Sequence, residues 1–320
     1  MKDYILVPLD GSALSEAILP HAVAVARTKR SALLLLQILE PVFEPIFGAI
    51  GLPDYVEEEQ LLQMRDEQFA AINHYLEKIA SQLRADGLEV ITKVIEGNHP
   101  ATQILWEIEH DPLILTIAMM THGRRGILHW LFGSVAAEIV QVTPRPLLLL
   151  RPEESDRSFS MLNFKVAHYQ NIVVPLDASP FAEQALDQAF ELALAMNANL
   201  HLISIVPFPH ILPVHIHKEE KESQLVIRAV LHDLEVKRHE QYLRQKAEQF
   251  RERGISVRTD VSSGHPAEAI LGFCSQNEQT LLVMTTHGRS GLRRIVLGSV
   301  AMKVVQEAHV PVLLVRGRHS

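Results

Sequence analysis

The 320-residue sequence has a single cysteine, Cys274, so no disulfide bond can form within the chain. One thiol in a chain of this length is typical of a reducing compartment. Long apolar runs are also missing, because stretches such as ALLLLQIL are far shorter than the ~20 residues of a membrane-spanning helix. The opening residues, MKDYILVPLDGS, contain no apolar stretch of signal-peptide length. These absences lead us to expect a cytoplasmic protein that has no membrane partner.

An excess of basic residues is absent as well. The chain has 30 Lys and Arg against 38 Asp and Glu, which gives a formal net charge of −8. Proteins that bind nucleic acids or anionic membranes do so through basic surfaces, so we expect neither kind of partner. A local basic site can exist within an acidic chain, and small anionic ligands therefore remain open.

What the chain does contain is a duplication. YILVPLDGSALSEAIL near the start returns as NIVVPLDASPFAEQAL, and THGRRGILHWLFGSVAAEIV returns as THGRSGLRRIVLGSVAMKVV. The spacing between the matching aspartates, Asp10 and Asp177, is about half the chain, which indicates tandem domains and not a solenoid. We predict a first domain over residues 1–152, a linker over 153–169 and a second domain over 170–320.

Within each half, short apolar runs alternate with helical patterns. Near-continuous apolar strands separated by helices are typical of a parallel sheet that is covered on both faces. Ser12 is expected to cap a helix, and Pro100 and Pro266 fit the first turn of another. The sequence therefore predicts an α/β protein with two tandem, doubly wound, five-stranded parallel sheets of Rossmann-like type. A ligand crevice is expected at the carboxyl ends of the strands, where the strand order reverses.

Each half also has a proline-containing excursion after its second strand. These excursions, EPVFEPIFGAIGLPDYVEEEQ and PFPHILPVHIHKEEKESQ, are predicted to be loops. The polar stretches that follow are predicted to be amphipathic helices.

The repeated loops carry a Gly-Ser pair where a helix is expected to start, at Gly133-Ser134 and Gly298-Ser299. Glycine permits close approach of a ligand to the backbone, and a helix N-terminus offers N–H groups and the positive end of the helix dipole to an anion. The same residues fit a tight strand-to-helix turn capped by serine. Neither GxxxxGK[ST] nor GxGxxG is present. From the residues alone, an anion cradle and a structural turn both remain open.

Together, ILVPLDGS, GHPAEAIL, MTTHG and the nine-residue gap to GSVA resemble the universal stress protein family over nearly the whole chain. The resemblance implies a five-stranded parallel α/β fold in each half, and one branch of the family binds ATP through G-x2-G-x9-G-[ST]. In this chain the first motif glycine falls on Met120 and Thr285, and the second on Gly123 and Gly288. The family position lies against ribose and phosphates, where methionine would crowd a nucleotide more than threonine. The resemblance therefore favours the second half.

The resemblance further implies ATP, ADP or AMP as the ligand, with Mg2+ carried by the phosphates. Asp10 and Asp177 match the family aspartate beside the nucleoside, although an aspartate there can instead stabilise a turn or a helix start. Ile38 and Ile205 match the position whose backbone faces adenine. The implied site residues are Pro175, Asp177, Ile205, Met284, Thr285, Gly288, Gly298, Ser299 and Val300 in the second half, and Pro8, Asp10, Ile38, Met119, Gly123, Gly133, Ser134 and Val135 in the first.

We expect a stress-response protein in which an adenine nucleotide acts as a switch or a stability effector. The alternatives are a protein–protein interaction module with vestigial pockets and a slow ATP hydrolase. No catalytic residue is predicted, because neither a general base nor a Walker-type lysine is evident. His215 and His217 do not define a metal site on their own. Cys274 is expected to be an inert core thiol. The halves are expected to form a pseudo-dimer, with homodimerisation as a further expectation.

Overall fold

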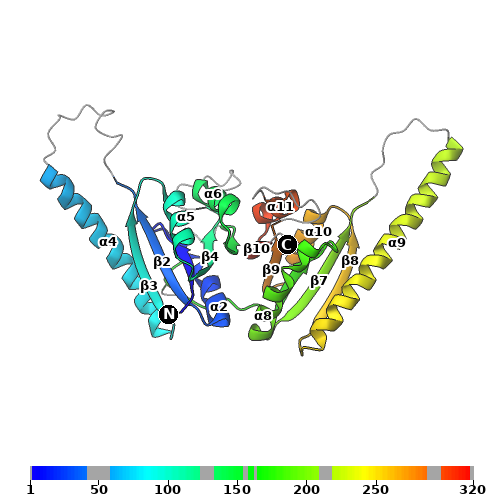
Figure 1. Ribbon diagram of the computed structural model, residues 1–320, viewed down its shortest axis with the longest axis horizontal. Helices are drawn as coiled ribbons and strands as arrows, with labels where there is room; N and C mark the ends of the chain where they lie inside the picture. Colours follow the sequence, from blue (N-terminus) through cyan, green and yellow to red (C-terminus); the bar gives the residue numbers. More distant parts are fainter. Residues whose placement is uncertain are drawn as a thin grey trace. The chain divides into compact units, whose positions relative to one another are not determined.

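The structure, a computed structural model, describes residues 2–41, 58–122, 133–153, 158–161, 164–208, 218–286 and 297–317. The chain divides into two compact units, Met1–Ala167 and His168–Ser320 (Figure 1). The boundaries proposed from the sequence, with a linker over 153–169, stay a prediction.

In its described residues, the first unit contains a five-stranded parallel sheet with the order β3-β2-β1-β4-β5. Helices connect the strands, and α4 packs against β2 and β3 (Figure 1). The elements are β1 (Tyr4–Pro8), α1 (Ala13–Glu16), α2 (Leu19–Lys29), β2 (Ala32–Leu39), α4 (Glu58–Ala85), β3 (Val90–Glu96), α5 (Pro100–His110), β4 (Ile114–Met120), α6 (Ser134–Val142) and β5 (Leu147–Leu150).

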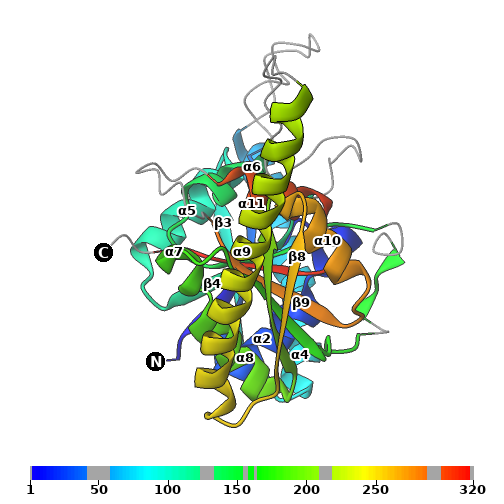
Figure 2. The ribbon, with the colours of Figure 1, turned by 90° about the vertical axis from the view of Figure 1, so that its right-hand side faces the viewer.

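The second unit repeats this arrangement, with the strand order β8-β7-β6-β9-β10. Its long helix α9 lies along β7 and β8 (Figure 2). The elements are β6 (Asn171–Pro175), α7 (Pro180–Glu183), α8 (Leu186–Met196), β7 (Asn199–Val206), α9 (Lys218–Arg251), β8 (Val257–Ser263), α10 (Pro266–Ser275), β9 (Thr280–Thr285), α11 (Ser299–Glu307) and β10 (Val312–Val315). The predicted fold class, two doubly wound parallel-sheet domains, is confirmed.

The central strands are buried because helices cover them. In β1 and β2, Ile5, Leu6 and Leu33 have no exposed surface, and the same holds for Ile172 and Val173 in β6. Cys274 is 3% exposed in α10, and burial raises the pKa of its thiol to about 12. This thiol is therefore protonated at neutral pH, as expected for an inert core position. None of the described helices combines the length and the apolar character needed to cross a membrane.

Helix starts follow the local sequence signals. Ser12 caps α1 by accepting a hydrogen bond from the Ser15 N–H at 3.1 Å, as predicted. Ser179 caps α7 in the same way. Pro100 and Pro266 lie in the first turns of α5 and α10, where proline loses no intrahelical hydrogen bond.

The prediction placed the ends of the two proline-containing loops too far along the chain. Residues 218–224 and 58–60 were expected in loops, but α9 begins at Lys218 and α4 begins at Glu58. These residues are mostly Glu, Lys and Gln, which favour helix, and none is proline or glycine. Proline and glycine earlier in each excursion mark loop locally, but their effect does not reach these residues.

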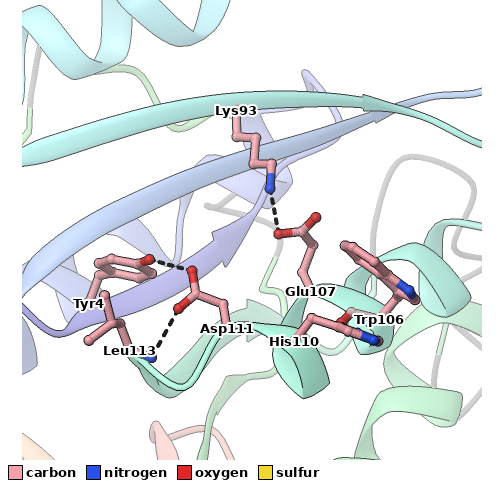
Figure 3. Close-up of polar contacts among 7 residues, drawn as sticks. All are labelled: Tyr4, Lys93, Trp106, Glu107, His110, Asp111 and Leu113. Carbon is pink, nitrogen blue, oxygen red and sulfur yellow. Dashed lines mark hydrogen bonds and ion pairs between the residues drawn. The ribbon is translucent and has the colours of Figure 1, made fainter.

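A set of polar contacts joins α5 of the first unit to the sheet (Figure 3). The Tyr4 hydroxyl donates to Asp111, whose other carboxylate oxygen accepts from the Leu113 N–H at 3.0 Å. Burial, followed by the effect of Asp111, raises the pKa of Tyr4 to about 12. Lys93 of β3 pairs with the buried Glu107 at 2.6 Å. These contacts fix the carboxyl end of α5 and lie apart from the strand ends that carry the predicted site.

Candidate functional site

The strand order reverses at the same place in each unit. In the first, the chain leaves β1 for β2 on one side, whereas β4 lies on the other side of β1; in the second, β6 lies between β7 and β9 in the same way. In doubly wound sheets, ligands bind outside the carboxyl ends of the strands at this reversal. Pro8 and Met120 are the last residues of β1 and β4, and Pro175 and Thr285 are the last of β6 and β9.

Each predicted aspartate follows the first strand of its unit. Asp10 Oδ1 accepts hydrogen bonds from the Ser12 N–H at 3.0 Å and from the Ser12 hydroxyl at 2.5 Å. Asp177 Oδ1 accepts from the Ser179 N–H at 3.0 Å. These contacts are the turn-stabilising role that was the alternative for both residues. Contact between either carboxylate and a nucleoside stays a prediction.

The residue after each aspartate has a left-handed backbone. Gly11 has φ +81° and Ala178 has φ +63°. This conformation turns the chain from the strand into the capped helix, and it is easily adopted by glycine but strained for alanine. The two units therefore make the same turn, but only the second has a side chain at that position.

The predicted Gly-Ser pairs begin helices, as expected, and hydrogen bonds tie those helices to the sheet. The Gly133 N–H donates to the Thr121 carbonyl at 2.8 Å, and the Gly298 N–H donates to the Thr286 carbonyl at 2.8 Å. Thr121 and Thr286 directly follow β4 and β9. The N-termini of α6 and α11 are thus held at the carboxyl ends of those strands (Figure 1).

The first turns of these two helices present N–H groups along the helix axis. The first intrahelical donors are the N–H of Ala137, bonded to Gly133 O at 2.9 Å, and the N–H of Met302, bonded to Gly298 O at 2.8 Å. The N–H groups of residues 134–136 and 299–301 precede these donors, so the helix ladder does not use them. Together with the positive end of the dipole, such groups bind anions.

The two cap glycines are not required by the backbone conformation. Gly133 has φ −67° and Gly298 has φ −63°, each with ψ 154°, a combination open to any residue. Glycine is also a common N-cap residue, so these angles fit both a structural turn and a cradle that lets a ligand approach the backbone closely. The choice between the two stays a prediction.

The other predicted residues line the strand ends. Met119, Met120, Met284 and Thr285 are between 4% and 6% exposed, and Ile205 is 9% exposed. Ser134 and Ser299 are exposed at the helix starts, and Pro8, Pro175, Ile38, Val135 and Val300 are partly exposed. The topology therefore brings the described members of each set to one edge of their sheet. Gly123, Gly288, His215 and His217 lie outside the described residues.

Sequence reasoning missed a carboxylate–tyrosine pair beside each aspartate. The Tyr75 hydroxyl donates to Glu16 at 3.0 Å in the first unit, and the Tyr242 hydroxyl donates to Glu183 at 2.9 Å in the second. In the second unit Lys246 also donates to Glu183, at 2.7 Å. The sequence did carry a signal for these glutamates, because both lie within the repeated segment that contains the aspartate.

These pairs have perturbed protonation equilibria. Burial raises the pKa of Glu16 above its ordinary value, although the hydrogen bond from Tyr75 acts in the opposite direction. The pKa values of Tyr75 and Tyr242 are raised, first by burial and then by their glutamate partners. Both tyrosines therefore remain protonated donors at neutral pH.

A second polar pair is found in the second unit and was also missed. Ser204 and His239 are 0% and 4% exposed, and Ser204 Oγ lies 2.6 Å from His239 Nδ1. Ser204 Oγ also lies 2.6 Å from the carbonyl oxygen of Leu176, the residue before Asp177. The matching positions in the first unit are Gln37 and Ile72. The buried pair therefore contacts the backbone directly before Asp177.

Among the described residues, no group of three or more His, Cys, Asp or Glu side chains is arranged to hold a metal ion. His122, in the repeated THGR segment, lies with its Nδ1 3.1 Å from Thr121 Oγ1.

Comparison with known proteins agrees with the fold and the repeated segments. The model of the universal stress protein family matches residues 1–151 and again 168–316. The chain therefore belongs to the universal stress protein family, in its tandem two-domain form.

Individual relatives show the same pattern. A universal stress protein of Methanocaldococcus jannaschii is 32% identical over 151 residues, which is 46% of this chain and 82% of that protein. A universal stress protein of Mycolicibacterium smegmatis is 23% identical over 317 residues, 98% of this chain and 97% of its own length. Among solved structures, a universal stress protein of Archaeoglobus fulgidus matches 99% of both chains with a TM-score of 0.65 and 18% identity, a likeness of fold.

Proposed function

We propose that this universal stress protein binds an adenine nucleotide at the carboxyl edge of its second unit and uses it as a switch or stability effector in a stress response. The observation that carries the proposal is a glycine-capped helix N-terminus, tied by a hydrogen bond to a strand end at the reversal of strand order. The arrangement occurs in both units, so the same chemistry is available twice.

The residues of the second unit fit the chemical parts of a nucleotide. The N–H groups of residues 299–301 and the exposed Ser299 hydroxyl offer donors to phosphate oxygens. Asp177 offers carboxylate oxygens to ribose hydroxyls or to adenine, and Ile205 would lie at the adenine position. When bound, the phosphates would carry Mg2+.

The first unit is the weaker candidate because of one residue. Met120 and Thr285 both end a strand and are both buried, at 4% and 5% exposed. The longer methionine side chain would occupy space where the family motif has glycine. This observation favours the vestigial-pocket alternative for the first unit alone.

A nucleotide bound to the folded state would stabilise it by mass action. At ~100 times its dissociation constant, such a ligand contributes roughly 2.7 kcal/mol, enough to bias an interface or a conformational equilibrium. This effect needs no chemical step, so the proposed function is binding. ATP hydrolysis, if slow, would limit the lifetime of the bound state.

The test is calorimetric titration of nucleotide-stripped full-length protein with ATP, ADP, adenosine and tripolyphosphate, each with and without Mg2+. We expect saturable ATP binding at least about tenfold tighter than that of adenosine or tripolyphosphate, because each of these lacks one half of the recognised groups. Gly298→Val should abolish it, and circular dichroism should show an unchanged fold. The φ of −63° at this position tolerates a Cβ, so lost binding reports lost space and not backbone strain. Absence of saturable ATP binding would leave the interaction-module alternative.

A further inference from the structure

Helix α9 carries a row of polar side chains on the face that packs into its own unit. His239, Tyr242 and Lys246 are spaced by three and four residues, so they lie on one side of the helix. Leu243, beside them on the same side, has no exposed surface, and α9 packs against β7 and β8. These three residues, the polar row, therefore reach groups inside the unit.

The first member of the row reaches the residue before Asp177. The Ser204 hydroxyl donates to the Leu176 carbonyl at 2.6 Å, and Ser204 Oγ lies 2.6 Å from His239 Nδ1. A hydroxyl has one proton and a carbonyl only accepts, so His239 Nδ1 carries the proton that is donated to Ser204 Oγ. His239 thus connects α9, through one buried serine, to the backbone directly after β6.

The other two members reach the short helix that follows Asp177. The Tyr242 hydroxyl and Lys246 Nζ donate to Glu183 at 2.9 and 2.7 Å. Glu183 ends α7, which is capped by Ser179, and the Ser179 N–H donates to Asp177 Oδ1 at 3.0 Å. Asp177 also contributes, after burial and Glu183, to the raised pKa of Tyr242. Helix α9 therefore contacts both ends of the segment that bends after Asp177.

The bend between these contacts is strained. Ala178 has φ +63°, a left-handed conformation that is unfavourable for alanine. Such strain persists where surrounding contacts fix the backbone, and it is concentrated at functional sites. In the first unit Gly11 makes the same turn without strain, and Ile72 and Ile79 occupy the positions of the histidine and the lysine. The strained residue and the additional polar contacts therefore occur in the same unit.

We propose that the polar row positions the Asp177 carboxylate so that the second unit selects a nucleotide over phosphate groups alone. The inference rests on the proposed nucleotide site, and it assigns a part in recognition to residues of α9 that act through Ser204 and Glu183. In that site the phosphates bind at the N-terminus of α11. Loss of the row should therefore weaken recognition of the nucleoside and leave recognition of the phosphates unchanged.

Calorimetric titration of the nucleotide-stripped full chain with ATP and with tripolyphosphate, each with Mg2+, tests the inference. Lys246→Ile introduces the residue of the first unit and should weaken ATP binding about tenfold, with less than about a twofold change for tripolyphosphate. Tyr242→Phe keeps the ring, loses one hydrogen bond and should act in the same direction, even if Lys246→Ile fails to fold. Lys246→Arg keeps the positive charge beside Glu183 and should retain ATP binding.

The matched control is Lys237→Ile, the same replacement on the same helix, at a lysine that pairs with the exposed Asp233. It should change the affinity for neither ligand.

A double-mutant cycle tests whether the row acts through Asp177. In an Asp177→Asn background, Lys246→Ile should change ATP affinity less than about twofold, because the carboxylate that it positions is gone. Additive losses, equal losses for ATP and tripolyphosphate, or unchanged ATP affinity in both Lys246→Ile and Tyr242→Phe would each overturn this inference and leave the proposed function standing. A wild-type chain that binds neither ligand would overturn the proposed function, and this inference with it.

Discussion

Glu16 accepts a hydrogen bond from Tyr75 in the first unit, whereas the matching Glu183 in the second accepts from Tyr242 and from Lys246. The position of Lys246 is occupied by the buried Ile79 in the first unit. The strand order, the serine caps and the glycine-capped helices are shared, yet the side chains behind the strand ends differ. The duplicated backbone is thus maintained by local signals, whereas the residues that contact these glutamates differ between the units.

The largest expected effect comes from exchanging the residues at the first motif position. Thr285→Met should weaken ATP binding to the second unit about 100-fold, because a longer side chain occupies space beside the ribose and phosphates. Met120→Thr should in turn allow binding to the first unit, at some cost in stability from the loss of a buried side chain. Calorimetric titration of both variants measures the change. Equal affinity in wild type and Thr285→Met would show that this position does not limit the site.

The second-largest effect is expected when the buried Ser204–His239 pair is disrupted. Ser204→Ala leaves the Leu176 carbonyl and His239 Nδ1 without the serine, and an unsatisfied buried polar group costs about 1–3 kcal/mol. Urea unfolding gives the change in the free energy of unfolding. The matched control is Gln37→Ala, which should cost less, because Gln37 Oε1 is buried and makes no hydrogen bond with the described residues. Similar losses in both variants would contradict the role given to the pair.

Replacing Glu16 and Glu183 by glutamine should have opposite effects on stability at neutral pH. The folded-state pKa of Glu16 is raised by burial, so its favourable contribution is complete below its unfolded pKa and is lost as pH rises through the folded value. Glu16→Gln avoids that loss, and its Tm relative to wild type should therefore rise from about pH 4 to about pH 7. Glu183→Gln should instead lower the Tm at neutral pH, because it removes the partner of Lys246. Scanning calorimetry measures both changes, and a Glu16→Gln variant whose Tm relative to wild type does not change between these pH values would refute the role given to Glu16.

The smallest effect is expected at the left-handed turn after each aspartate. Ala178→Gly should stabilise the second unit by about 0.5–1 kcal/mol, since glycine adopts φ +63° without steric strain. Gly11→Ala should destabilise the first unit by a similar amount through strain alone, because the nearest atom to an added Cβ is 3.9 Å away. Chemical denaturation measures both changes. A destabilising Ala178→Gly would mean that the alanine methyl group makes a packing contact worth more than the strain.

The sequence was sufficient for the fold because the deciding signals are local. Apolar runs, Ser12 and the prolines Pro100 and Pro266 act over a few residues, and the repeat presents each signal twice. The start of α9 was predicted wrongly because a proline was taken to mark loop beyond its own neighbourhood. Contacts such as Tyr242 with Glu183, 59 residues apart, depend on how the helix docks on the sheet and leave no local pattern.

The candidate site was predictable only in part for the same reason. Gly133 and Gly298 could be placed at helix starts from the sequence, but their tie to Thr121 and Thr286 depends on how each helix returns to its strand. Their extended backbone angles were likewise not given by the residue type, since glycine also adopts left-handed conformations.

Adenine-nucleotide binding by the second unit is tested most directly by counting the ATP sites of the full chain by equilibrium dialysis. Wild type and Gly133→Val should each bind about one ATP per chain with high affinity, and Gly298→Val should bind none up to about 1 mM ATP while retaining its fold. Equal site counts in Gly298→Val and wild type, or no saturable binding by the stripped wild-type protein, would contradict the account.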